Sequence, residues 1–135
     1  MAFYPVSGQM WLAGLARTAL ANSLIKLYQS SFTPNALTTL AELTAAEADY
    51  TGYAAKTITA WNAAFYSALG GAIQMPLQQF QPTDPTTVAN TIGGAWVETS
   101  GGVLVSIIPF PAPVAMSTPF SAIPISEILR FGSGL

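Results

Sequence analysis

Proline and glycine divide this chain into short segments. Ten prolines and eleven glycines are distributed over 135 residues. Proline cannot donate a hydrogen bond to a central ladder, so within sheets it is confined to edges, strand ends and bulges. The stretches between these residues are rich in branched and aromatic side chains, which is typical of short strands bounded by turns. This pattern predicts a mainly β fold, an antiparallel β-sandwich or a jelly-roll-like barrel, rather than alternating helices and strands.

The strongest local signal is the segment IGGAWVETSGGVLVSII. Residues 95–99 and 103–107 have strand composition and flank a Ser-Gly-Gly turn, so we expect a β-hairpin there. Pro109, Pro111 and Pro113 follow directly. They predict that the chain continues as an extended edge strand or connection, where missing N–H donors are tolerated.

The N-terminal segment has a different pattern. Apolar residues at helical spacing predict a helix over about residues 9–21, and residues 24–29 then alternate with the period of a strand. A length of 135 residues suits one compact domain. We therefore expect a single β domain, with residues 1–22 as an N-terminal arm or short helix and residues 23–135 as the β-sandwich core.

Charge is scarce along the whole chain. Charged residues make up 7% of it, against about 25% in an average soluble domain. A surface with so few charges favours association, so we expect other subunits to cover part of it. The net charge is -2 with only four cations, which argues against nucleic-acid binding. The apolar run over residues 10–27 is interrupted by Arg17 and Lys26, which argues against a membrane span.

Several catalytic mechanisms are excluded because the chain has neither histidine nor cysteine. Ser-His and Cys-His catalysis would need one or both. Glu42, Glu47 and Asp49 are close in sequence and could gather around a hard cation such as calcium, but they lack a recognised ligand spacing, so we favour a solvated acidic turn. No enzyme activity, metal or cofactor is predicted. Gly52, between two tyrosines, predicts a turn before the next strand.

The aromatic residues offer two interpretations. Trp11, Trp61, Trp96 and the tyrosines could form a stacking platform for sugar rings, or they could be core and interface anchors, which is the commoner use. Aromatic side chains beside prolines offer large, rigid contact areas. On this basis the predicted interface residues are Phe3, Tyr4, Trp11, Phe110 and Phe120.

A family resemblance covers residues 24–105. The segment IKLYQSSFTPNALTTLAELTAAEADYTGYAAKTI, followed by VANTIGGAWVET and GGVLV, resembles a group of small virion proteins of tailed phages and prophages. In that group a short strand, a Thr-Pro turn, a TGYA-type segment and a later hairpin recur. The resemblance transfers no functional residues, and GGAWVE stands here where the group has a YGWF-type sequence.

The resemblance implies a non-enzymatic structural protein located in the phage particle. The expected role is a capsid cement or decoration protein that binds the head, and the expected partner is the major capsid protein or another virion protein. A homo-oligomer is also expected, with a trimer favoured. The alternatives are a tail or fibre accessory protein and a carbohydrate-binding module.

Overall fold

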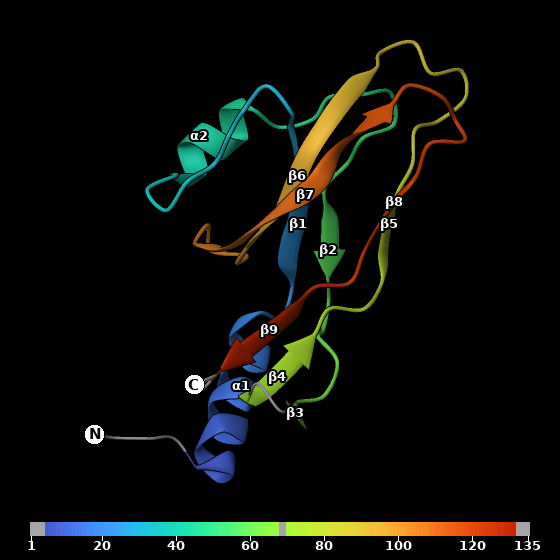
Figure 1. Ribbon diagram of the computed structural model, residues 1–135. Helices are drawn as coiled ribbons and strands as arrows, with labels where there is room; N and C mark the ends of the chain where they lie inside the picture. The colour runs from blue at the N-terminus through green and yellow to red at the C-terminus, as the bar shows by residue number, and fades with distance from the viewer. Residues whose placement is uncertain (1–4, 68–69, 132–135) are drawn as a thin grey trace. The chain divides into compact units, whose positions relative to one another are not determined.

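The computed structural model describes residues 5–67 and 70–131, and the chain forms two compact units. Unit 1 combines the N-terminal residues up to Asn22 with Ile58–Gln78 and the C-terminal residues from Ile125. Unit 2 consists of Ser23–Thr57 and Gln79–Pro124. Strands predominate in the described residues and the sheets are antiparallel (Figure 1), which confirms the predicted mainly β fold class. The sandwich or jelly-roll arrangement stays a prediction.

Unit 1 consists of one helix and a three-stranded sheet. Helix α1 spans Val6–Ala19, and the sheet has the order β3-β4-β9, with β3 at Phe65–Ser67, β4 at Gly70–Gln74 and β9 at Ile128–Phe131. The helix packs mainly against the central strand β4. The predicted N-terminal helix is therefore present, but it is part of a folded unit and not an arm. The sequence assigned residues 23–135 to one core. Two segments of it, Ile58–Gln78 and the segment from Ile125, belong instead to the unit that contains the helix.

Gly71 allows the helix backbone to approach the sheet. A Cβ atom at Gly71 would lie 2.5 Å from the backbone oxygen of Gln9, far inside van der Waals contact. The Gln9 side chain also accepts a hydrogen bond from the Gly71 N–H at 3.2 Å. Ala13, one turn further along the same face of α1, is fully buried. Small residues on both sides thus permit a close contact that larger side chains would prevent.

Unit 2 is built on the sheet of order β2-β1-β6-β7. Strand β1 spans Ser23–Gln29, β2 spans Lys56–Ile58, β6 spans Asn90–Glu98 and β7 spans Leu104–Met116. Strands β6 and β7 form the predicted hairpin, which is longer than the sequence indicated. Strand β7 lies at the edge of this sheet, as its prolines predicted.

A second helix, α2 at Leu40–Ala45, was not predicted from the sequence. Thr39 and Glu42 form a reciprocal capping box that satisfies N–H groups at its first turn. Leu43 is buried in a cluster with Tyr28 and Trp96 of the sheet, so α2 covers one face of it (Figure 1). Burial of this apolar face offsets the weakness expected of so short a helix.

A second glycine makes room beneath α2. A Cβ atom at Gly94 would lie 2.3 Å from the Tyr28 hydroxyl oxygen and 2.5 Å from the backbone oxygen of Ile108. The Tyr28 ring therefore passes over β6 where there is no side chain. The Gly-Gly pair in IGGAW thus allows the close packing of Tyr28 and Ser30 on β6.

The remaining strands are β5 at Gln78–Phe80 and β8 at Ile123–Ile125, which pair with each other. Phe80 is buried, and its ring stacks on that of Tyr53 at a centroid distance of 6.3 Å. Among the described residues, no helix has both the length and the apolar character needed to cross a bilayer.

Candidate functional site

The acidic residues serve separate structural contacts. Glu47 accepts a hydrogen bond from the Tyr53 hydroxyl at 2.9 Å, and the Asp49 carboxylate accepts one from the side-chain amide of Asn90 at 2.8 Å. Glu42 is the acidic member of the α2 capping box. Within residues 5–67 and 70–131, no group of three or more Asp, Glu, His or Cys side chains could hold a metal ion. The calcium interpretation of this segment is therefore not supported.

The two tyrosines around Gly52 take part in the packing of unit 2, where Tyr50 is buried and Tyr53 is partly buried. Gly52 has a φ of 87° and forms the predicted turn. The Tyr53 hydroxyl accepts a hydrogen bond from the Leu27 N–H at 3.2 Å, and its ring lies edge-on to Tyr50 at 5.4 Å. Burial raises the pKa of Tyr50 to about 12 and also raises the pKa of Tyr53. Both rings therefore contribute to the packing of unit 2.

The three tryptophans do not form one stacking platform. Trp61 and Trp96 are buried, with exposed fractions of 1% and 0%. The Lys26 amino group lies 5.9 Å from the centroid of the Trp96 ring and 2.7 Å from a Glu98 carboxylate oxygen. Trp11 is 65% exposed. Trp11 and the exposed tyrosine Tyr66 could therefore stack on an external ring, whereas Trp61 and Trp96 could not.

The predicted interface residues have different environments. Phe3 and Tyr4 lie outside the described residues. Trp11 and Phe120 are exposed, and Phe120 reaches 92%. Phe110 is partly buried and lines a hollow beside β7. Trp11 belongs to unit 1, whereas Phe110 and Phe120 belong to unit 2.

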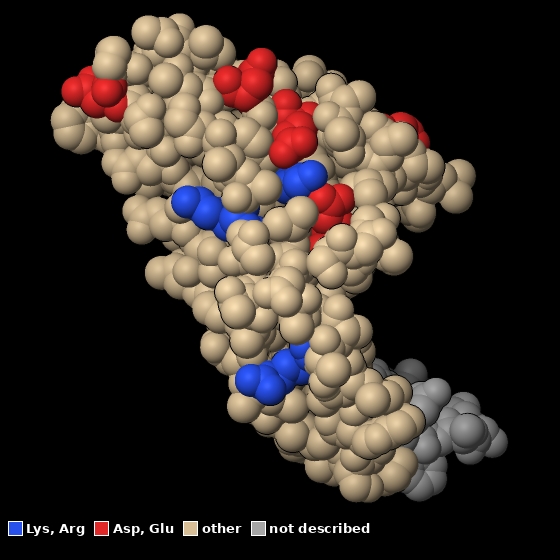
Figure 2. All heavy atoms as spheres, turned by 180° about the vertical axis from the view of Figure 1, so that it is seen from behind, with Lys and Arg blue, Asp and Glu red and all other residues tan. Residues whose placement is uncertain are grey.

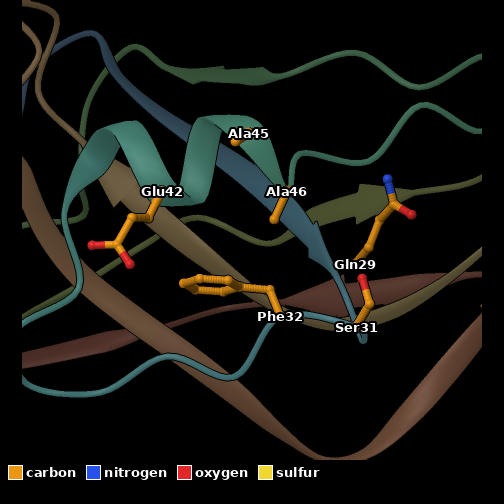
Figure 3. A pocket seen from close by; sticks show the side chains of 6 residues that line it. All are labelled: Gln29, Ser31, Phe32, Glu42, Ala45 and Ala46. Carbon is orange, nitrogen blue, oxygen red and sulfur yellow. The ribbon is translucent and has the colours of Figure 1, made fainter.

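A hollow of about 420 Å³ lies beside α2. Figure 3 shows the Phe32 ring lying below the helix, with the Glu42 carboxylate at one end and Ser31 and Gln29 at the other. Glu42 is the only ionisable residue in its wall, and Ser31 lies at the opposite end, beyond the Phe32 ring (Figure 3). The complete lining is Gln29, Ser31, Phe32, Glu42, Ala45 and Ala46.

A second hollow, of about 200 Å³, lies beside the edge strand β7. Its lining has no charged side chain and consists of Phe110, Pro111, Ala112, Val114, Ala122, Ile123 and Pro124. The strand register explains its position, because Gly94 faces Pro109 whereas Ile92 already faces Val114. Residues 110–113 therefore leave the ladder and bulge away from β6.

Neither hollow was predicted from the sequence. The Thr-x-x-Glu pattern at 39–42 could have indicated the start of α2, and with it one wall of the larger hollow. The prolines of β7 indicated an edge but not the bulge. A comparison of the chain with protein-family models, curated proteins and solved structures found no match.

Proposed function

We propose that the chain is a structural protein of a tailed-phage particle, a cement or decoration protein that binds the outer surface of the head and stabilises it. The observation that carries this proposal is the set of large apolar side chains exposed on both units. It comprises Val6, Trp11, Leu15, Leu37, Phe65, Tyr66, Leu77, Val88, Val103, Val105 and Phe120. The resemblance of residues 24–105 to small virion proteins supports the same role.

The scarcity of charge fits this role physically. Figure 2 shows one face on which acidic and basic side chains are few and uncharged residues cover most of the surface. Neutral and apolar surface favours association over a dispersed monomer. A decoration protein is present in many copies on a symmetric lattice, so contacts that are individually weak add through multivalency. Glu42, Glu47, Asp49 and Glu98 each have a structural hydrogen-bond or ion-pair partner, which supports a structural over a catalytic use of these carboxylates.

The test compares particles with and without the chain. Particles purified from a host carrying the gene should contain the chain in stoichiometric amounts by mass spectrometry. Particles that lack it should release their genome at a lower temperature, and adding the purified chain should restore the original temperature. Absence of the chain from purified particles would overturn the proposal, as would unchanged heat resistance. Labelling confined to tails or fibres would replace the head assignment by an accessory role.

A further inference from the structure

Phe120 lies at the tip of a hydrogen-bonded turn of unit 2. The Ser121 N–H donates to the Thr118 backbone oxygen at 3.1 Å, and the Phe120 N–H donates to the Thr118 hydroxyl at 3.3 Å. The Gln81 side chain donates to the backbone oxygen of Pro119 and ties the turn to a distant segment. The aromatic ring at the tip is 92% exposed. Because these hydrogen bonds hold the backbone that carries the ring, less conformational entropy would be lost when the ring binds a partner.

The hollow beside β7 has the size and chemistry to receive such a ring. It measures about 200 Å³ and its lining is uncharged, and cavities of about 150 Å³ are known to accommodate benzene. One wall is formed by residues 122–124, which follow the turn directly in the chain. Phe120 (the knob) and the hollow beside β7 (the hole) are therefore neighbours on unit 2. The exposed ring of Phe120 nevertheless does not occupy the hole of its own chain.

We propose that a second copy of this chain docks here, with Phe120 of each copy inserted into the β7 hollow of the other. When a knob and a complementary hole are adjacent on one surface, a two-fold axis between them satisfies both contacts at once. The contact is then isologous and closed, and it produces a dimer where the sequence favoured a trimer. This inference concerns self-association and does not depend on the proposed role in a phage particle.

Side chains, not backbone, would make this contact. Pro109, Pro111 and Pro113 have no N–H to offer along the outer part of β7, so a second chain cannot extend the sheet over this stretch. Burial of two phenylalanine rings and of the hollow walls they cover removes about 800 Å² from water in total, at about 200 Å² for each surface. Standard stable interfaces bury about 1,200–2,000 Å². We therefore expect a weak, reversible dimer.

The first experiment measures self-association of the purified chain by sedimentation equilibrium. Phe120→Ala should weaken the dimer by about 30-fold or more, as for a central aromatic anchor. Leu37→Ala is the matched control, since Leu37 is 87% exposed on the same unit but far from the hollow in sequence. It should leave the association constant unchanged. A native chain that stays monomeric at millimolar concentration, or equal effects of the two substitutions, would overturn the proposal.

The second experiment tests the reciprocal geometry. Ala112→Glu places a charge in the hollow and should also prevent dimerisation, while circular dichroism confirms that both variants are folded. Chains with Phe120→Ala keep the hole, and chains with Ala112→Glu keep the knob. A mixture of the two, with one variant fluorescently labelled, should form mixed dimers through one intact contact and associate more strongly than either variant alone. A mixture that associates no better would refute reciprocal docking.

Discussion

The hydroxyl group of Tyr53 provides the sharpest test of how unit 2 is held together. It accepts a hydrogen bond from the Leu27 N–H at 3.2 Å and donates one to Glu47 at 2.9 Å. The ring separately stacks on Phe80. Tyr53→Phe therefore removes both hydrogen bonds while it preserves the ring contacts, so the hydroxyl contribution can be measured alone.

The expected cost follows from what each partner loses. Leu27 is fully buried, and a buried N–H left without an acceptor costs about 1–3 kcal/mol. The bond to Glu47 lies nearer to solvent and adds about 0.5–1 kcal/mol. Tyr53→Phe should thus lower the free energy of unfolding by about 2–3 kcal/mol. Tyr66→Phe, at a half-exposed position, should change it by less than about 0.5 kcal/mol.

Urea unfolding followed by circular dichroism measures this difference, and hydrogen exchange of the Leu27 amide locates it. That amide should exchange faster in Tyr53→Phe than global destabilisation alone explains. If Tyr53→Phe and Tyr66→Phe have equal effects, the hydroxyl contributes no net stability and the reasoning is refuted. Unchanged exchange at Leu27 would equally show that the N–H has another acceptor.

Four further substitutions test the other local contacts. Gly94→Ala places a Cβ against Tyr28 and the opposing backbone, so the thermal midpoint should fall in line with an overpacking cost of about 1–3 kcal/mol. Thr39→Ala should cost about 1 kcal/mol by loss of the α2 cap, whereas Glu42→Gln should retain most of that stability because glutamine also serves in a capping box. Burial raises the pKa of Glu127, so its stabilising effect is present below the unfolded pKa and is lost as pH rises through the folded one. The stability of Glu127→Gln relative to the native chain should therefore increase between pH 4 and pH 7, as measured by urea unfolding.

Features fixed by local chemistry could be predicted from the sequence. The β6–β7 hairpin follows from strand composition around a Ser-Gly-Gly turn, and the edge position of β7 follows from prolines that cannot donate. The turn at Gly52 follows from the tolerance of glycine for positive φ. In each case the determining residues lie within a few positions of the feature they determine.

Features that depend on distant partners could not be predicted in the same way. Trp61 and Trp96 are as apolar in sequence as Trp11, and only packing decides that the first two are buried. Helix α2 is too short to form from propensity alone and depends on Tyr28 and Trp96 beneath Leu43. Unit 1 is assembled from three separate segments, and no composition change in the chain marks those boundaries.

The structural role of α1 changes how the predicted contact role of Trp11 must be tested. Gln9 and Ala13 lie on the face of α1 that packs against β4, whereas Trp11 and Leu15 are exposed on the opposite face. Deletion of the N-terminal segment would uncover Gly71 and its strand, so a loss of particle binding would not distinguish a missing contact from an unfolded unit.

Trp11→Ser avoids this ambiguity because it changes only the outer face of the helix. We expect the free energy of unfolding to change by less than about 0.5 kcal/mol, and binding to particles to weaken by about 30-fold if Trp11 is a central contact. Ser7→Ala, an exposed position on the same helix, serves as the control that should alter neither quantity. Wild-type particle binding by a folded Trp11→Ser chain would remove Trp11 from the predicted interface and leave Phe110 and Phe120 as the remaining described candidates.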